Sequence, residues 1–172
     1  MRNLAILIIL CAVILGIGYA IPHIMKPTND NVDLAMMDEQ VQNFEFQSLG
    51  GDHHALHDFM GNPVMVHFWA TWCAPCVVEF PELVQFAINN PNVTIIAVSS
   101  DTETDKIDRF LNQYVSNQPP NMIIVHDVRQ TITQDRFGTF QLPETYILDS
   151  DLVLTEKIIG AYKDLDTFQF LP

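Results

Sequence analysis

The chain has 172 residues, a length typical of one domain, with 48% hydrophobic and 17% charged residues. It carries 8 Lys and Arg against 21 Asp and Glu, which gives a formal net charge of −13 at pH 7. This acidity argues against nucleic acid as the main partner, because phosphate binding depends on Lys and Arg. The apolar content excludes a wholly disordered protein.

The N-terminus contains an apolar segment, residues 4–21, that carries no charge. As a helix it would be about 27 Å long, close to the hydrocarbon thickness of a bilayer. Arg2 favours a cytoplasmic N-terminus and an extracytoplasmic remainder. Residues 1–21 are therefore expected to be an uncleaved membrane anchor. The alternative is a secretory signal, with small residues at 18 and 20 offering a cleavage site.

Residues 22–42 are predicted to be a linker, because they are rich in proline, asparagine and acids and show no sustained period. The folded domain is then expected at residues 43–172. It should begin with a β-hairpin, since Phe44 and Phe46 alternate with polar residues and Gly50-Gly51 supplies a turn.

Beyond the hairpin, apolar runs and helical spacings alternate along the chain. Strands are expected at residues 63–69, 93–99, 122–125, 145–148 and 152–159. A helix is expected after Cys76, kinked at Pro81, with apolar positions 80, 83, 84, 87 and 88. Further helices are expected over 107–115, with Thr102 and Asp105 at the capped start, at 129–137 and briefly at 163–170. This alternation predicts an α/β layer fold with a mixed sheet.

The segment Trp-Cys-Ala-Pro-Cys at residues 72–76 is the strongest chemical signal. It follows a predicted buried strand and opens a predicted helix, so Cys73 would lie at a helix N-terminus, where unpaired N–H groups favour the thiolate. Cys76, one turn later, could then resolve a mixed disulfide. The alternatives are an inert structural disulfide and half of a zinc site, which would need two more ligands.

Residues 67–76 resemble the active-site segment of thioredoxin-like proteins, and more specifically of the extracytoplasmic, membrane-anchored TlpA/ResA/DsbE (CcmG) group. The resemblance extends over residues 43–161. It includes the C-x-x-E-x-P continuation, which supplies Glu79, and matches at residues 61–64 and 99–101. Residues 142–149 resemble the proline segment opposite the dithiol, and the Pro-Glu-Thr sequence within them is typical of the DsbE (CcmG) branch.

The resemblance implies a thioredoxin-like fold, a central mixed sheet flanked by helices, with the hairpin as an N-terminal extension. It implies that Cys73 attacks a substrate disulfide, that Cys76 resolves the product, and that the bond between Leu142 and Pro143 is cis. An ordinary proline at the start of a strand is the alternative for Pro143. The expected substrate-binding residues are Trp72, Leu142, Pro143 and Glu144.

Two further residues are expected to handle protons. Glu79 would lie near Cys76, where a carboxylate opposes thiolate formation and can shuttle the thiol proton. An exposed helix face is the alternative for Glu79. His67 stands six residues before Cys73, where thioredoxins carry a buried Asp. It could accept the Cys76 proton or be a hydrogen-bonded core histidine.

The charge pattern favours electron donation. No Lys or Arg occurs between Lys26 and Lys106, so no cation close in sequence stabilises a thiolate at Cys73. A less stabilised thiolate means a less stabilised reduced form, and the protein should therefore tend to donate electrons.

These observations predict a single-pass thiol:disulfide oxidoreductase of the bacterial inner membrane, with its catalytic domain in the periplasm. We expect it to reduce the thiols of apocytochrome c for haem attachment and to be recharged by a membrane electron donor. One alternative is a dithiol reductase with another client, such as a copper-site protein. The other is a metal carrier that uses the dithiol with His53, His54 and His57. We expect no organic cofactor, no resident metal and a monomer.

Overall fold

A computed structural model describes residues 38–115 and 117–162 of the chain. The predicted anchor at 1–21, most of the predicted linker at 22–42 and the predicted helix at 163–170 lie outside the described residues. Within the described part, no helix combines the length and the apolar character needed to cross a bilayer.

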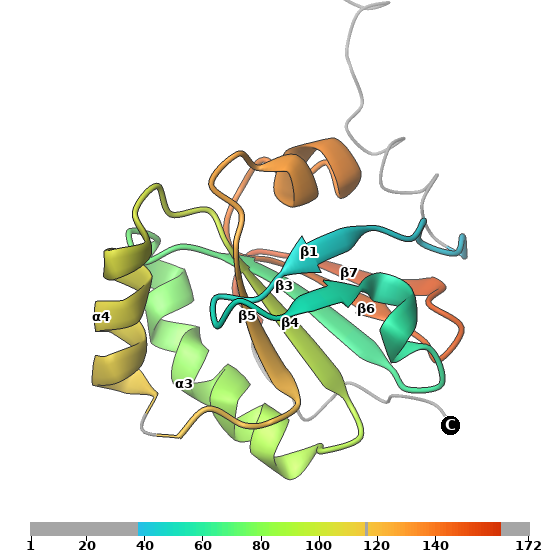
Figure 1. Cartoon of the computed structure of the whole chain (residues 1–172), viewed down its shortest axis with the longest axis horizontal. Helices are drawn as coiled ribbons and strands as arrows, with labels where there is room; N and C mark the ends of the chain where they lie inside the picture. Colours follow the sequence, from blue (N-terminus) through green and yellow to red (C-terminus); the bar gives the residue numbers. More distant parts are fainter. Residues whose placement is uncertain (1–37, 116, 163–172) are drawn as a thin grey trace, which may run out of the picture. The chain divides into compact units, whose positions relative to one another are not determined.

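A five-stranded mixed sheet forms the centre of the described fold (Figure 1). Its strand order is β5-β4-β3-β6-β7. Strands β3, β4 and β5 are parallel to one another, whereas β6 runs antiparallel to both β3 and β7. The strands span β3 Val64–Trp69, β4 Thr94–Ser99, β5 Met122–His126, β6 Glu144–Leu148 and β7 Leu154–Ile159. The predicted α/β layer fold with a mixed sheet is confirmed.

Two helices cover one face of this sheet, α3 (Ala74–Asn89) and α4 (Thr104–Tyr114), and they lie beside one another in Figure 1. Side chains on a strand point alternately to opposite faces, so β3 contributes to two cores. Met65 and Trp69 pack with α3 and α4. Val64, Val66 and Phe68 pack on the other face. His67 has the same parity as Met65 and Trp69 and therefore faces α3.

The opposite face is covered by the N-terminal hairpin and two short helical turns. The hairpin pairs β1 (Glu45–Gln47) with β2 (His53–Ala55), as predicted, and Gly51 adopts a φ of +98° in its turn. The short turns are η1 (Leu56–Phe59) and the π-helical η2 (Thr131–Arg136). The backbone N–H of Leu49 donates to the carbonyl of Ile124 at 2.7 Å, which ties the hairpin to the edge strand β5.

Three local predictions differ from the structure. Ile88 follows the apolar spacing of α3 but is 54% exposed, whereas Phe86 and Ala87 in the same turn are buried. Helix α4 has Glu103 as its N-cap residue, with no side-chain cap, so the predicted capping by Thr102 is wrong. The helix predicted at 129–137 is shorter, because Asp127 accepts the backbone N–H groups of Thr131, Ile132 and Thr133 and sets its first turn.

Candidate active site

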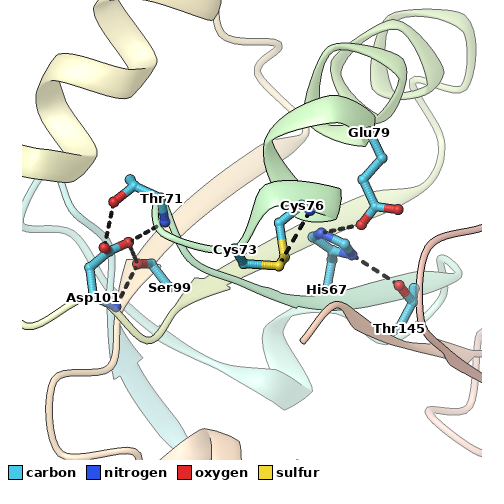
Figure 2. The surroundings of a disulfide bond; sticks show 8 residues. All are labelled: His67, Thr71, Cys73, Cys76, Glu79, Ser99, Asp101 and Thr145. Atoms are coloured by element: carbon cyan, nitrogen blue, oxygen red, sulfur yellow. Dashed lines mark hydrogen bonds and ion pairs between the residues drawn. A yellow bond between two sulfur atoms is a disulfide. The ribbon is translucent and has the colours of Figure 1, made fainter. Parts of the chain in front are cut away.

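The two cysteines form a disulfide at the N-terminus of α3 (Figure 2). Cys73 is the N-cap residue, and Pro75 occupies the first turn, where a missing N–H is tolerated. The backbone N–H of Cys76 points at the Cys73 sulfur, at 3.3 Å. After reduction, this N–H and the helix dipole stabilise a thiolate on Cys73. The helix start predicted from the sequence is therefore confirmed.

The two sulfur-bearing residues differ in accessibility. Cys73 is 6% exposed, whereas Cys76 is completely buried. Trp72, directly before Cys73, is 67% exposed. Cys73 thus keeps a small exposed fraction next to an exposed side chain, whereas Cys76 has none. This asymmetry is the one that a nucleophilic and a resolving cysteine need.

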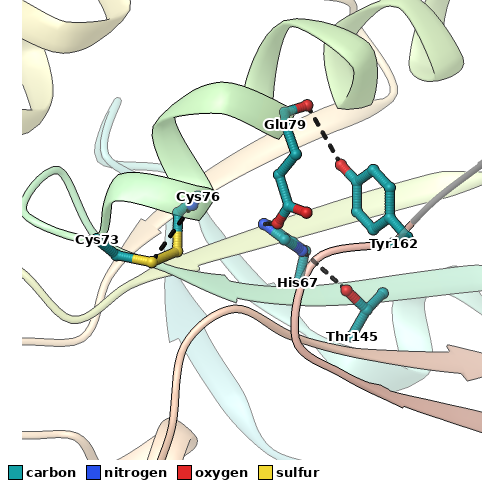
Figure 3. A network of polar contacts seen from close by, with 6 residues as sticks. All are labelled: His67, Cys73, Cys76, Glu79, Thr145 and Tyr162. Atoms are coloured by element: carbon teal, nitrogen blue, oxygen red, sulfur yellow. Dashed lines mark hydrogen bonds and ion pairs between the residues drawn. A yellow bond between two sulfur atoms is a disulfide. The ribbon is translucent and has the colours of Figure 1, made fainter.

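The residue beneath the dithiol on β3 is His67, which is completely buried. Its Nδ1 lies 2.9 Å from Thr145 Oγ1 on β6, and its Nε2 lies 3.4 Å from Glu79 Oε1 on α3. Figures 2 and 3 show the His67 ring next to the Glu79 carboxyl, with both groups on the Cys76 side of the disulfide. The sequence placed His67 and Glu79 separately near the dithiol, and the fold brings their side chains together.

Burial dominates the electrostatics of this pair. Desolvation lowers the pKa of His67 to about 3. Desolvation also raises the pKa of Glu79 to about 8, the Tyr162 backbone opposes this rise, and the nearby charge of Glu82 adds to it. At pH 7 both side chains are therefore mainly neutral. The contact is then a neutral imidazole facing a carboxylic acid rather than an ion pair.

The atoms with which His67 and Glu79 face one another have few other hydrogen-bond partners. Among the residues that the structure describes, neither Glu79 carboxyl oxygen nor His67 Nε2 has a partner in hydrogen-bond alignment. The Tyr162 ring lies 6.0 Å from the His67 ring, and its hydroxyl donates to the Glu79 carbonyl at 3.4 Å (Figure 3). Burial also raises the pKa of Tyr162. Tyr162 was not predicted for the site, and no local sequence signal marks it.

The peptide bond between Leu142 and Pro143 is cis, as the resemblance implies. Leu142 packs against the apolar cluster that contains both cysteines, so the proline segment adjoins the site. Pro143 is buried, and its carbonyl accepts the backbone N–H of Gly160 on the neighbouring chain segment at 2.9 Å. The loop is therefore joined to the end of β7.

Glu144 lies on the opposite face of the sheet from His67 and Glu79. It pairs with Phe68 across the β3–β6 ladder, whereas Thr145 pairs with His67. Glu144 is buried, with Lys157 Nζ 3.3 Å from its Oε1 and the Tyr146 hydroxyl 3.3 Å from its Oε2. Its carboxylate thus faces partners inside the fold, although the sequence predicts that Glu144 contacts substrate.

One contact close to the dithiol was not predicted from the sequence. The carboxylate of Asp101, which follows β4, accepts both the backbone N–H and the hydroxyl of Thr71. In the sequence, residues 99–101 were part of the family resemblance, but no role was predicted for them. A usable signal was present, because parallel neighbouring strands end at the same edge of a sheet, which places the residues after β3 beside those after β4.

The histidines of the hairpin lie apart from this chemistry. The His54 ring packs 5.5 Å from Phe46 and 5.8 Å from Phe59, and His53 Nε2 lies 3.4 Å from Gln47 Nε2. No cluster of three or more His, Cys, Asp or Glu suited to a metal ion occurs in the described ranges.

A disulfide between a slightly exposed N-cap cysteine and a fully buried cysteine one turn later, with an adjoining cis proline, defines a thioredoxin-like dithiol site. Comparison with known proteins agrees with this class. Residues 37–157 match the family model described as the AhpC/TSA family. The thiol-disulfide oxidoreductase ResA of Bacillus anthracis is 32% identical over 124 residues, which cover 71% of this chain and 69% of ResA.

The thiol:disulfide interchange protein DsbE of Pseudomonas aeruginosa is 31% identical over 104 residues, covering 60% of this chain and 54% of DsbE. Among solved structures, a secreted Mycobacterium tuberculosis disulfide oxidoreductase has a TM-score of 0.62 at 23% identity, over 72% of this chain and 89% of that one. StoA from Bacillus subtilis has a TM-score of 0.58 at 20% identity, over 70% of this chain and 90% of StoA. These structures support the fold.

The chain belongs to the AhpC/TSA family of thioredoxin-like proteins, and within it is a thiol-disulfide oxidoreductase of the ResA and DsbE type.

Proposed function

We propose that this protein is a membrane-anchored, extracytoplasmic reductant that keeps the thiols of apocytochrome c reduced for haem attachment. The main support for this role is the Pro143-Glu144-Thr145 segment, whose sequence is typical of the DsbE (CcmG) branch and which begins at the cis bond. The similarity to a protein named DsbE supports the same role.

The proposed reaction is a dithiol-disulfide exchange. The Cys73 thiolate attacks one sulfur of the substrate disulfide, which forms a mixed disulfide and releases the other substrate sulfur as a thiolate that takes a proton. The Cys76 thiolate then attacks the Cys73 sulfur and releases the second substrate thiol. Two electrons and two protons pass to the substrate, and the protein is left with the Cys73–Cys76 disulfide.

The second step needs an acceptor for the proton of the buried Cys76. We assign this role to Glu79 together with His67, because the two side chains are 3.4 Å apart and lie on the Cys76 side of the disulfide (Figures 2 and 3). The pKa of Glu79, raised to about 8 by burial, makes both of its protonation states accessible near neutral pH. The thiol proton can thus pass through the pair without leaving an isolated charge in the core.

Substrate binding is assigned to the surface beside Cys73. The exposed Trp72 would contact the partner chain, and the backbone at Leu142 and Pro143 would orient it in extended form. Glu144 is proposed to act on this surface only indirectly, because its carboxylate lies on the opposite face of the sheet, 3.3 Å from Lys157 Nζ.

The cations of the described domain support a reducing potential. Lys106 pairs with Glu103 at 2.8 Å, Arg109 with Asp105 at 2.9 Å, and Lys157 with Glu144. These are three of the five Lys and Arg side chains in the described residues, and the N-terminus of α3 contributes its own stabilisation to the Cys73 thiolate. A modestly stabilised thiolate corresponds to a protein that donates electrons.

Residues 1–21 are proposed to anchor the protein in the bacterial inner membrane, with the catalytic domain in the periplasm. A membrane electron donor would return two electrons to the Cys73–Cys76 disulfide after each cycle. Carbonate extraction of membranes, with protease protection in intact and in permeabilised spheroplasts, tests this topology. Release of a shortened protein into the periplasmic fraction would favour a cleaved signal instead.

The first test is the reduction potential of the Cys73–Cys76 pair, measured by redox titration against dithiothreitol. We expect a value around −270 mV, like that of thioredoxin. A value around −120 mV, like that of a strong oxidant, would overturn the proposal, because such a protein makes disulfides.

The second test identifies the client. The Cys76→Ser variant cannot resolve the mixed disulfide, so it should retain an apocytochrome c on Cys73, identified by mass spectrometry after non-reducing electrophoresis. The matched Cys73→Ser variant should retain nothing. The greater coverage of ResA than of DsbE favours one competing role, a dithiol reductase with another client. Exclusive trapping of a copper-site protein would establish that role.

A further inference from the structure

The Cys73 sulfur is presented by a tight turn over residues 70–73. The backbone N–H of Cys73 donates to the carbonyl of Ala70 at 3.1 Å, which closes the turn. Thr71 is its second residue, the exposed Trp72 its third, and Cys73 its last and the N-cap residue of α3. The position of Thr71 therefore influences both the contact residue and the nucleophile.

Asp101 holds Thr71 through both of its carboxylate oxygens (Figure 2). The backbone N–H of Thr71 donates to Oδ2 at 2.9 Å, and the Thr71 hydroxyl donates to Oδ1 at 2.6 Å. The Ser99 hydroxyl adds a third hydrogen bond to Oδ2 at 2.8 Å. Asp101 is completely buried, so these protein donors, rather than water, satisfy its carboxyl oxygens.

The carboxylate is itself fixed to the sheet. The backbone N–H of Asp101 donates to Ser99 Oγ at 3.1 Å, and the Asp101 carbonyl accepts from His126 Nε2 at 2.8 Å. Ser99 pairs with Trp69 across the parallel β3–β4 ladder. Asp101 thus connects the active-site turn to β4 and β5, two elements that carry no cysteine.

We propose that Asp101 is a positioning residue for thiol-disulfide exchange, which acts through Thr71 to hold the turn over residues 70–73 so that the Cys73 sulfur faces the N–H of Cys76. The 3.3 Å separation of that N–H from the sulfur makes the contact sensitive to small displacements of the turn. The inference rests on the exchange activity of the family and is independent of the client.

Asp127 supplies a matched control within the same fold. It is also buried, and its carboxylate also accepts several hydrogen bonds, from Thr131, Ile132 and Thr133. These bonds hold η2 rather than the active-site turn. A variant at Asp127 therefore reproduces the loss of a buried, hydrogen-bonded carboxylate without acting on Thr71.

The decisive variant is Thr71→Val in the full chain, purified in detergent. Valine keeps the shape and the backbone N–H but removes the hydroxyl donor, and the Asp101 residue itself is not substituted. We expect the rate constant of the reduced protein with glutathione disulfide to fall about tenfold, because the sulfur is displaced from the helix N-terminus. The equilibrium with glutathione should move roughly threefold toward the protein disulfide.

Thr71→Ser keeps the donor and should restore both values to those of the unsubstituted protein. Asp127→Asn should lower stability to urea while leaving the rate and the equilibrium unchanged. Equal rates and equilibria for Thr71→Val and the unsubstituted protein would overturn the proposal. If Thr71→Val does not fold, Ser99→Ala is the substitute, because it removes one hydrogen bond to the same Asp101 carboxylate and leaves Thr71 in place. An unchanged exchange rate in that variant would also overturn the proposal. Glutathione is the probe throughout, so failure of the apocytochrome c role would not affect the result.

Discussion

His67 Nε2 and Glu79 Oε1 lie 3.4 Å apart in the core, on a strand and a helix that meet beneath the dithiol. Both side chains are buried, and desolvation moves their pKa values in opposite directions, to about 3 for His67 and to about 8 for Glu79. Each group is thereby kept neutral at pH 7. Once Glu79 is ionised, it can accept a proton from a buried thiol without separating charge, because one buried anion replaces another.

The first prediction concerns stability and pH. The pKa of Glu79 is about 4.5 unfolded and about 8 folded, so the folded state binds the proton more tightly. The contribution of Glu79 is therefore fully present below pH 4.5 and is lost as the pH rises toward 8. The substituted side chain of the Glu79→Gln variant cannot ionise. The free energy of unfolding of the unsubstituted protein should therefore fall, relative to that of the variant, as the pH rises from 4.5 toward 8.

Urea unfolding of the oxidised proteins between pH 4 and pH 9 measures this difference. Glu45→Gln is the control, because it makes the same substitution at an exposed strand position and should change the free energy of unfolding by no more than about 0.5 kcal/mol. A pH-independent difference for Glu79→Gln would show that its carboxyl does not keep its proton in the fold.

The second prediction concerns the resolving step. Ionised Glu79 is needed to take the Cys76 proton, so the rate of resolution in the unsubstituted protein should rise with pH around a midpoint near 8. Glu79→Gln should slow this step about a hundredfold at pH 8 and abolish the midpoint. Stopped-flow mixing of the reduced protein with glutathione disulfide separates this step from the first attack. An unchanged pH profile in Glu79→Gln would exclude Glu79 as the proton acceptor.

The third prediction concerns recognition by Trp72. Because its side chain is 67% exposed, Trp72→Ala should leave stability within about 0.5 kcal/mol of the unsubstituted protein. The KM for a protein disulfide substrate should rise, while the rate with glutathione disulfide should be unchanged. Val78→Ala is the control, since Val78 is also an exposed apolar side chain, 76% exposed on α3. An equal rise of KM in both variants would argue against a specific contact at Trp72.

The fourth prediction concerns the buried pair on the other face of the sheet. Lys157→Met leaves the Glu144 carboxylate without its ammonium partner at 3.3 Å and should destabilise the fold by about 3 kcal/mol. Combining it with Glu144→Gln should recover a large part of that loss, because no unpaired charge is then left. Thermal unfolding of the two single variants and the double variant completes the cycle. Additive losses would mean that the two groups are not coupled.

Much of the site is local in sequence and could be predicted. Cys73, Cys76 and Pro75 lie within one turn at the start of a helix, and the order of strand, motif and helix follows from hydrophobic patterning alone. The hairpin and all five central strands were predicted in the same way. The cis bond at Pro143 was predicted only through the resemblance, because local propensity gives little preference for cis.

Other features depended on tertiary structure. Thr145 reaches His67 from 78 positions away, and Asp101 reaches Thr71 from 30 positions away, because the sheet pairs strands that are distant in the chain. The placement of Glu144 shows the same effect, since a strand turns successive side chains to opposite faces and directs Glu144 away from Thr145. The sequence by itself therefore determined the reacting sulfurs and the class of chemistry. Only the tertiary structure decided which buried groups surround them, because desolvation and hydrogen bonding act between residues that only folding brings together.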